Sequence, residues 1–279
     1  MAYPRTYRAY RRTAPPYPLS IALSTETLPE SLGPHDVLVR IRAVSLNFRD
    51  VAMLHEGRYP VPVETGGIPA SDCAAEVVAV GDQVNRFGVG DRVAPTVNSA
   101  YLTGTGGVSM FALAICLAAG IKPIITSSSD SKLEKVKAIG PEVQGINYKT
   151  HTDTAAEALS LTNGRGVDFV INNIGPSSIP SDLTALRKKG GTISLIGFLE
   201  GLEADWSPSI LLTLMIKAAK LQGILAGSRK DFEDLNKFLE EKNVQLDSII
   251  DRTYAFEDCP AAFEYLYSGK HVGKVVIKL

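Results

Sequence analysis

The sequence predicts an α/β protein in which a small all-β module precedes a doubly wound parallel sheet covered by helices. Three observations lead to this prediction. Short strand-like runs separated by Gly, Pro and Asp fill the first third of the 279 residues, and strand-like and helix-like runs then alternate. A glycine-rich turn, Gly104-Thr-Gly106-Gly107-Val-Ser109, stands close to the point where the pattern changes.

The strands of the all-β module are expected between residue 7 and about residue 95. The runs are "YRAYRR" (7–12), "VLVRIRAVSL" (37–46) and "AAEVVAVG" (74–81), with turns at "SLGPHD" and "RFGVGD".

From residue 122 onward, apolar strand-like runs alternate with helix-like runs, which predicts a parallel sheet with helices on both faces. The expected strands are "KPIITSS" (122–128), "GINYK" (145–149), "VDFVINNIG" (167–175), "TISLIGF" (192–198) and "LQGILAG" (221–227). Helices are expected at 131–140, 154–162, 181–190, 229–243 and 259–269, and a last strand at 274–279.

Composition and charge limit the classes of partner and the locations that we expect for this protein. Hydrophobic residues make up 45% of the chain and charged residues 21%, which is typical of a globular protein with a sizeable core. A net charge of -1 predicts neither a nucleic-acid nor a membrane partner. Cys73, Cys116 and Cys259 lie far apart and form no disulfide or zinc-finger pattern. With no signal-peptide core at the N-terminus and no membrane-length apolar run, we expect a cytoplasmic protein.

The glycine-rich turn suits a dinucleotide. Gly104, Gly106 and Gly107 allow a tight turn and a close approach to a pyrophosphate, and the helix expected from Val108 directs unpaired N–H groups at the phosphates. Ser109 replaces the third glycine of the fingerprint, and its small side chain still permits close helix packing. A plain tight turn is the alternative.

The end of the next strand favours NADPH over NADH. An acidic residue that would hold the ribose 2′-hydroxyl is expected there, but the sequence has hydroxyl side chains at 126–129, with Ser127 and Lys132 suited to a 2′-phosphate. Alternatively, Asp130 or Ser131 caps the following helix, with Ser131 and Glu134 forming a capping box.

Nine segments carry a resemblance to a known family: "SLNFRD", "GRYP", "AAEVVAVG", "VGDRV", "GTGGVS", "INYK", "GGTISLIGF", "GILAGSR" and "HVGKVVIKL". Together the sequence resembles the zinc-independent medium-chain dehydrogenase/reductases, the branch of quinone oxidoreductases and enoyl reductases. The resemblance implies an incomplete GroES-like substrate domain, residues 1–98 completed by 229–279, and a Rossmann NADP-binding domain, residues 99–228. It also implies a homodimer through the edge of the Rossmann sheet, near "LQGILAG".

The resemblance also assigns the catalytic residues. Asn47 and Ser71 occupy the positions of zinc ligands in the zinc-dependent branch, so the resemblance implies a reaction without metal. Asn47 would contact the nicotinamide or the substrate carbonyl, and Asp50 would hold the loop. Tyr59 would line the substrate site and donate a proton to an enolate, or would simply pack at a turn.

Further positions are implied to border the cofactor. Tyr148 would contact the adenosine end, Gly175 and the segment 195–198, with Gly197 and Phe198, would border the nicotinamide, and Lys274 would lie near the bound cofactor. Lys274 is otherwise a solvated charge at the start of the last strand. His55 could reach the substrate entrance, although a surface histidine is the simpler interpretation.

The resemblance also indicates an internal deletion between the GroES-like domain and the glycine turn. Members of the family carry a β-hairpin set, a helix pair and the first Rossmann strand here, whereas this chain has only residues 94–103, of which Ala100 to Thr103 would have to form that strand. Loss of the stretch would expose apolar faces of both domains.

Three functions follow as hypotheses. The first is a metal-free NADPH-dependent reductase of a quinone, an enone or a similar small carbonyl compound, with a zinc-free alcohol dehydrogenase as a close variant. The second is a truncated, non-catalytic remnant with weak or no dinucleotide binding. The third is an NADPH sensor that binds without turnover.

Overall fold

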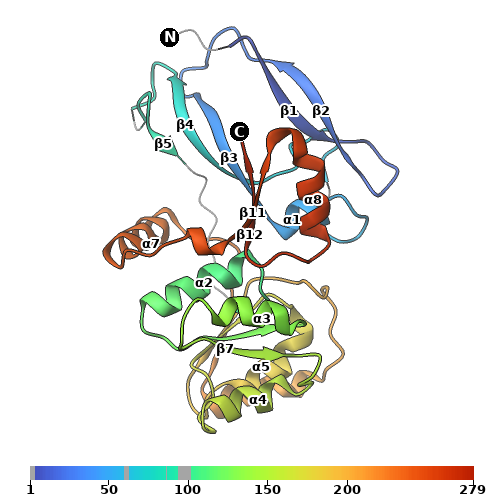
Figure 1. Ribbon diagram of the computed structural model, residues 1–279, viewed down its shortest axis with the longest axis vertical. Coiled ribbons are helices and arrows are strands. Elements are labelled where there is room, and N and C mark those ends of the chain that lie inside the picture. Colours follow the sequence, from blue (N-terminus) through green and yellow to red (C-terminus); the bar gives the residue numbers. More distant parts are fainter. Residues whose placement is uncertain (1–3, 60–62, 86, 94–101) are drawn as a thin grey trace. The chain divides into compact units, whose positions relative to one another are not determined.

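A computed structural model describes residues 4–59, 63–85, 87–93 and 102–279. The chain divides into two compact units, one formed by Met1–Pro95 with Asp251–Leu279 and the other by Thr96–Ile250. The return of the chain to the first unit therefore falls at residue 251, whereas the sequence placed it at residue 229. We describe each unit by itself (Figure 1).

The first unit is built from antiparallel strands, as the runs of its sequence predict. Strands β1 (Thr6–Arg12) and β2 (Ile21–Thr27) form a hairpin. A second sheet has the order β11-β12-β3-β4-β5, and within it β12, β3, β4 and β5 pair antiparallel. Its strands are β3 (Val37–Leu46), β4 (Asp72–Val80), β5 (Arg92–Val93), β11 (Ile250–Ala255) and β12 (Lys274–Lys278). The described strands do not close into a barrel.

Two helices complete the core of the first unit. Helix α1 (Phe48–Ala52) follows β3, and helix α8 (Cys259–Tyr267) follows a short 3-10 turn at Phe256–Asp258 and lies beside α1 (Figure 1). Val51, from α1, and Phe263, from α8, meet Leu46 and Val275 of the sheet in one buried cluster. This packing anchors the connection from Leu46 into α1, where the predicted site residues Asn47 and Asp50 lie.

The second unit contains the predicted parallel strands and helices. Strand β6 (Ile124–Ser127) pairs with β7 (Gln144–Asn147), and β8 (Phe169–Asn172), β9 (Thr192–Leu195) and β10 (Lys220–Gly223) form a three-stranded parallel sheet. The helices are α2 (Gly107–Ala118), α3 (Asp130–Lys137), α4 (Thr154–Leu161), α5 (Ile179–Ala185), α6 (Leu212–Lys217) and α7 (Arg229–Glu241), with 3-10 turns at Pro176–Ser178, Pro208–Leu211 and Asp247–Ile249. The alternation seen in the sequence is confirmed.

The parallel strands do not form one continuous sheet. No described strand lies between β6 and β8, which form the edges of two separate sheets. A cavity of about 1130 Å³ has residues of both strands in its wall, among them Ile124 and Val170. A first strand was expected at residues 100–103. Its first two residues lie outside the described part of the chain, whereas Leu102 and Thr103 are described and have no strand conformation, so the expectation is wrong for them.

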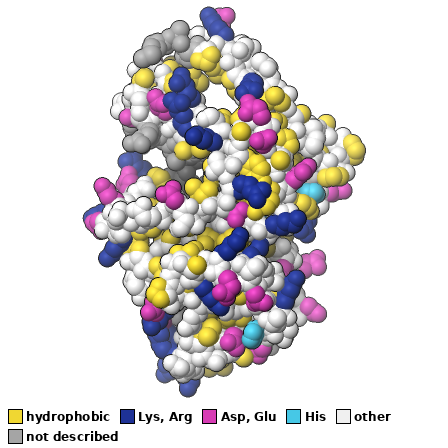
Figure 2. Space-filling model, viewed as in Figure 1, with side chains coloured by type: hydrophobic (Ala, Val, Ile, Leu, Met, Phe, Trp, Pro, Cys, Tyr) yellow, Lys and Arg dark blue, Asp and Glu magenta, His cyan; other side chains and the backbone are white. Residues whose placement is uncertain are grey.

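The surface carries mixed charge. Basic and acidic side chains are interspersed on the face shown in Figure 2, in keeping with 29 basic and 30 acidic residues in the chain. Within the described ranges, no helix combines the length and apolar character needed to span a bilayer.

Candidate functional site

Asn47 lies at the centre of a polar cluster in the first unit. Its backbone N–H donates to Oδ2 of Asp50 at 2.8 Å, which closes the first turn of α1, and Oδ1 of Asp50 accepts from the Ser71 hydroxyl at 2.9 Å. The Asn47 amide nitrogen donates to Oδ2 of Asp72 at 2.8 Å and lies 3.4 Å from the Ser71 hydroxyl oxygen. The fold therefore brings together Asn47, Asp50 and Ser71, three positions that the sequence singled out.

Lys274 joins the same cluster from the last strand. Strand β12 pairs with β3 so that Val275 stands opposite Leu46, which places Lys274 beside the end of β3. Its ammonium donates to the side-chain oxygen of Asn47 at 2.7 Å and to the carbonyl of Leu46 at 3.1 Å. The alternative of a freely solvated charge is therefore wrong, because two protein acceptors hold the ammonium.

The electrostatics of the cluster are those of a largely buried site. Asp50 has no exposed surface, and burial raises its pKa to about 6 against the opposing effects of its hydrogen bonds and of Arg49, whose guanidinium lies 3.5 Å away. Burial also lowers the pKa of Lys274, while the charges of Asp72 and Asp50 act in the opposite direction. Oδ1 of Asp72 is buried and has no hydrogen-bond partner among the described residues.

The donors of this cluster do not suit a zinc ion. An amide and a hydroxyl stand at positions 47 and 71, both side chains are already hydrogen-bonded, and an ammonium contacts the amide oxygen. Zinc sites use thiolate, imidazole or carboxylate ligands that converge on one point. Over the parts of the chain that the structure describes, no group of three or more His, Cys, Asp or Glu residues has that arrangement.

Tyr59 lies shortly after α1 and is half-buried. The guanidinium carbon of Arg49 lies 5.8 Å from the centre of its ring, so Arg49 connects the tyrosine to the Asp50 carboxylate. Pro60 of the "GRYP" segment lies outside the described residues.

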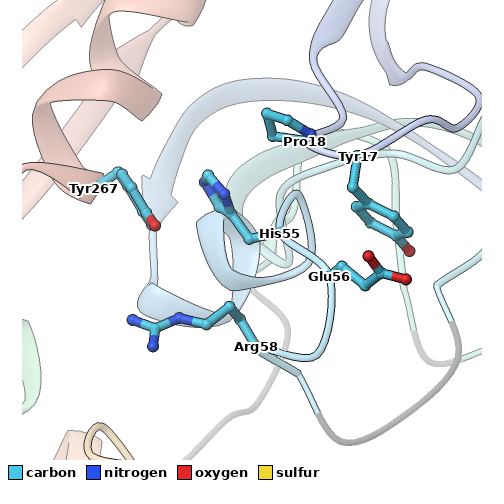
Figure 3. A pocket seen from close by; sticks show the side chains of 6 residues that line it. All are labelled: Tyr17, Pro18, His55, Glu56, Arg58 and Tyr267. Carbon is cyan, nitrogen blue, oxygen red and sulfur yellow. The ribbon is translucent and has the colours of Figure 1, made fainter.

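His55 belongs to a separate, open hollow of the first unit. Its ring stacks on Tyr267 with centroids 4.1 Å apart, and burial together with the charge of Arg58 lowers its pKa. Figure 3 shows these residues with Tyr17, Pro18 and Glu56 around a pocket of about 500 Å³. His55 is thus a half-buried histidine held by an aromatic neighbour.

The glycine turn of the second unit leads into α2, which is followed in the chain by β6. Gly104 has a φ of +85°, and its N–H donates to the Thr126 hydroxyl at 3.2 Å. Gly106 precedes the first residue of α2, Gly107, and Val108 follows. A Cβ added at Gly104 or Gly106 would meet no atom within 4 Å. The glycines therefore leave open space above the helix N-terminus, which fits an approaching pyrophosphate.

Ser109, in place of the third glycine, has a defined role. It is buried in the first turn of α2, and its hydroxyl donates to the carbonyl of Thr103 at 3.1 Å. This bond ties the helix to the segment that leads into the turn.

The hydroxyl-rich end of β6 lies beside Tyr148. The Tyr148 N–H donates to the carbonyl of Ser127 at 3.0 Å, and the Tyr148 side chain is 43% exposed. Ser127 is only 3% exposed, and its hydroxyl accepts from the N–H of Ser129 at 3.3 Å. Ser128 and Lys132 are half-buried.

The start of α3 differs from the expected capping box. Ser129 is the N-cap residue, and Asp130 and Ser131 are the first two residues of the helix. Oδ1 of Asp130 accepts from the Asn147 amide at 2.8 Å, so its carboxylate interacts with β7 instead of capping α3. The expected Ser131–Glu134 capping box is wrong, because a capping box requires its serine at the N-cap, and here the N-cap is Ser129.

The three residues expected near the nicotinamide lie together at the ends of β8 and β9. Gly175 has a φ of +118°, and a Cβ there would come within 2.9 Å of the Gly201 carbonyl oxygen and 3.2 Å of the Phe198 Cα. A Cβ at Gly197 would come within 2.7 Å of the carbonyl oxygen of Asn173. The N–H of Asn173 donates to the Thr103 hydroxyl at 2.9 Å, which links this group to the glycine turn.

Sequence reasoning missed two buried polar residues that hold this loop. Asn172 is fully buried, and its amide donates to the Gly175 carbonyl at 3.1 Å, the Ser178 hydroxyl at 2.8 Å and Oδ2 of Asp182 at 2.7 Å. Burial raises the pKa of Asp182 to about 6. For Asn172, the sequence signal that could have indicated this role is the pair of asparagines that ends the apolar run "VDFVINN".

Comparisons with known proteins agree with this architecture. A family model described as an alcohol dehydrogenase GroES-like domain matches residues 33–120, and one described as a zinc-binding dehydrogenase matches residues 107–241. A zinc-type alcohol dehydrogenase-like protein of Schizosaccharomyces pombe is 31% identical over an alignment that covers 90% of this chain and 93% of the relative.

The same alignment bears on the missing stretch. It runs over 328 positions, whereas the whole chain has 279 residues, so at least 49 residues of the relative have no counterpart here. Because such an alignment begins and ends on matched residues, the missing residues are internal to the chain.

Two solved structures share the fold. A Sinorhizobium meliloti protein provisionally described as an alcohol dehydrogenase superimposes with a TM-score of 0.86 at 28% identity, with both chains covered completely. The Escherichia coli quinone oxidoreductase, solved in complex with NADPH, gives a TM-score of 0.75 at 19% identity and covers 98% of this chain and all of its own.

Proposed function

The chain belongs to the medium-chain dehydrogenase/reductase superfamily of NAD(P)H-dependent oxidoreductases, and from that premise we propose a metal-free NADPH-dependent reductase of small carbonyl compounds. Quinones and α,β-unsaturated carbonyls are the proposed substrates. The observation that carries this proposal is the hydrogen-bonded Asn47 cluster, in which an amide, a hydroxyl and an ammonium stand where a catalytic metal would need ligands.

The second unit supplies the proposed cofactor site. Gly104, Gly106, Gly107 and Val108 would hold the pyrophosphate at the start of α2, because the turn leaves room for it and offers backbone N–H groups. Tyr148 lies at the end of β7, next to the end of β6, and would contact the adenosine. When bound, NADPH supplies a hydride from its dihydronicotinamide ring.

Preference for NADPH over NADH rests on the end of β6. Hydroxyl side chains stand there, and the nearest carboxylate, Asp130, is engaged by Asn147. Since Ser127 is buried, Ser128 and Lys132 are the side chains we propose for the 2′-phosphate, with Ser127 as support for the backbone. The E. coli neighbour solved with NADPH supports this preference.

Three residues of the first unit form the proposed substrate side. Asp50 fixes the start of α1 and the Ser71 hydroxyl, and so holds Asn47 in place. Asn47 borders the substrate carbonyl. Tyr59 donates a proton to the enolate carbon that remains after hydride addition, a role for which a phenol is suited when its geometry allows. Gly175, Gly197 and Phe198 shape the proposed nicotinamide end of the second unit.

A second candidate function has one observation in its favour. The cavity between β6 and β8 lies within the proposed dinucleotide-binding unit, so the chain could bind the dinucleotide weakly and without turnover. A zinc-free alcohol dehydrogenase remains a variant of the first proposal that differs only in substrate.

Partners and location follow the same proposal. We propose a small-molecule substrate, a cytoplasmic location consistent with free thiols at Cys73, Cys116 and Cys259, and a homodimer. Strand β10 is an outer strand of its sheet, and the neighbouring Leu225 is 95% exposed, which supports a dimer contact there.

Thermal unfolding tests the proposal first. A ligand that binds only the folded state raises the melting temperature, so excess NADPH should raise it more than excess NADH does. NADPH oxidation with benzoquinone and with a simple enone, in buffer containing a strong chelator, then tests catalysis. A shift without oxidation supports a protein that binds NADPH without turnover, and the absence of any shift contradicts the reductase in favour of a remnant that does not bind the dinucleotide.

A further inference from the structure

Lys274 has a hydrogen-bond donor that the protein does not use. An ammonium has three N–H groups. Two of them donate to the Leu46 carbonyl and to the Asn47 side chain, and no other bond from this ammonium exists among the described residues. The third N–H is therefore not engaged by any described residue.

The side-chain N–H groups of Asn47, by contrast, already face acceptors within the protein. Its amide nitrogen donates to Asp72 at 2.8 Å, and its second N–H faces the Ser71 hydroxyl at 3.4 Å and the Ser45 carbonyl at 3.5 Å. Its oxygen accepts from Lys274. The amide is thus oriented by an ammonium on one side and a carboxylate on the other, so that Asn47, which borders the proposed carbonyl site, acts there mainly as a support for Lys274.

The charges around Lys274 suit a donor that remains protonated. The groups that face it are the carboxylates of Asp72 and Asp50, both of which favour the ammonium form, and Arg49, which is paired with Asp50. No ion pair within 4 Å joins Lys274 to either carboxylate among the described side chains, so the ammonium is stabilised without being neutralised by direct contact. A fixed cation in a largely dry site stabilises negative charge that develops on a nearby oxygen.

We propose that Lys274 is a catalytic residue that donates its third N–H to the carbonyl oxygen of the substrate and stabilises the negative charge formed on that oxygen. Asn47 and Asp72 act as positioning residues for this ammonium. This inference deepens the proposed reductase function and rests on it. It replaces the role near the cofactor that the sequence suggested for Lys274.

The test uses binding of an oxyanion, so it does not depend on turnover. Titration of the full-length protein with p-nitrophenol, with and without NADP+, is followed in the phenolate absorption band. A site that offers an ammonium donor binds the phenolate form. We expect Lys274→Met to weaken phenolate binding about tenfold to a hundredfold, the usual effect of losing a hydrogen bond to a charged group. Lys274→Arg should retain most of the affinity.

Lys278→Met is the matched control, because Lys278 is an exposed lysine on the same strand, and its loss should leave phenolate binding unchanged. NADPH affinity, measured by fluorescence, should be the same in all three variants. The thermal transition of Lys274→Met shows whether this variant folds. If it does not, the wild type and Lys274→Arg still test the proposal, because the wild type must bind the phenolate form and Lys274→Arg must retain that binding.

The outcomes separate this inference from the proposed function. Phenolate binding that requires Lys274, without any oxidation of NADPH, supports the oxyanion site and contradicts the reductase. Turnover in the wild type, with phenolate binding absent or unaffected by Lys274→Met, overturns the role of Lys274 and leaves the reductase in place. A loss of NADPH affinity in Lys274→Met with phenolate binding retained would also overturn it, in favour of a cofactor contact.

Discussion

Tyr59 is the single side chain to which the proposed reaction assigns proton transfer. Replacement with Phe keeps the ring beside Arg49 and removes only the hydroxyl. We expect kcat for an enone to fall about a hundredfold, within the usual contribution of a general acid, while the affinity for NADPH stays the same. Tyr7→Phe, on the exposed β1–β2 hairpin, is the control. Equal rates in Tyr59→Phe and the wild type would remove Tyr59 as the donor.

A substitution at Ser128 tests the proposed preference for NADPH over NADH. A carboxylate at this position would repel a 2′-phosphate and could accept a bond from a ribose 2′-hydroxyl instead. Ser128→Asp should therefore weaken NADPH binding about tenfold, which corresponds to about 1.4 kcal/mol, and improve NADH binding. Fluorescence titration with both cofactors measures the change, and Ser160→Asp, at an exposed position of α4, controls for added charge. Unchanged affinities would place the 2′-phosphate elsewhere.

The buried carboxyl of Asp182 should make the free energy of unfolding depend on pH. Burial raises its pKa to about 6, above the roughly 3.9 of an unfolded chain, so the folded protein binds this proton more tightly. Its contribution to stability is present below about pH 4 and is lost as the pH rises through about 6, a change of about 2–3 kcal/mol.

Asp182→Asn cannot titrate, so its stability relative to the wild type should rise by that amount between about pH 4.5 and 7.5. Urea unfolding at several pH values measures the difference, with Asp205→Asn, at an exposed position, as the control. A constant difference across this range would contradict the raised pKa.

Among the individual site residues, the sequence identified some and missed others for a physical reason. Asn47, Asp50 and Ser71 were singled out through the resemblance to a known family, and the structure brings them together. The contact of Asn47 with Asp72 depends on the pairing of β3 with β4, and the two residues are 25 positions apart in the chain. The contact of Asn47 with Lys274 depends on the pairing of β3 with β12, and these residues are more than 200 positions apart. No local pattern encodes such a pairing, so the sequence placed Lys274 near the bound cofactor, with a solvated charge as the alternative, and did not predict its contact with Asn47.

Among the elements, the glycine turn that leads into α2 allows ligand binding and the stability of the chain to be tested separately. Gly106 has a φ of −79°, and a Cβ at this position would meet nothing within 4 Å. Gly106→Ala should therefore cost less than about 1 kcal/mol in the free energy of unfolding, the usual effect at a helix N-cap. It should weaken NADPH binding tenfold or more, because the methyl group would occupy the space proposed for the pyrophosphate.

Gly223→Ala is the matched control, since Gly223 in β10 also has open space around its Cβ position and lies away from the turn. Urea unfolding and NADPH titration distinguish the two effects. Undiminished NADPH affinity in Gly106→Ala would mean that the turn does not hold the pyrophosphate.

The periodicity of the sequence predicted these elements better than their ends. Strands β6 to β10 and helices α3, α4 and α7 all fall within or next to their expected runs, because alternation of apolar segments reflects burial directly. The cap of α3 was misplaced to Asp130 or Ser131, since four hydroxyl or acidic residues in succession, at 128–131, are all acceptable caps. Only the backbone geometry at Ser129 decides among them.

For the molecule as a whole, the division of the parallel sheet of the second unit is the feature with the largest consequences. In a continuous sheet every inner strand is hydrogen-bonded on both sides. Here β9 has two neighbours, whereas β6 and β8 have one described neighbour each, and the cavity borders both. Amide hydrogen exchange measures this directly, because amides without a partner exchange faster than those held in a ladder.

We expect β9, which contains the fully buried Ile193, to be the most slowly exchanging strand of the second unit, with β6 and β8 exchanging faster. NADPH bound at the glycine turn should slow exchange at the end of β6, near Ser127, and should change β10 little. Equal protection of β6, β8 and β9 in the free protein would show that the facing edges of β6 and β8 are paired after all. Because the proposed cofactor site lies across the ends of these same strands, slow exchange at β6 only in the presence of NADPH would mean that the cofactor itself stabilises the divided sheet.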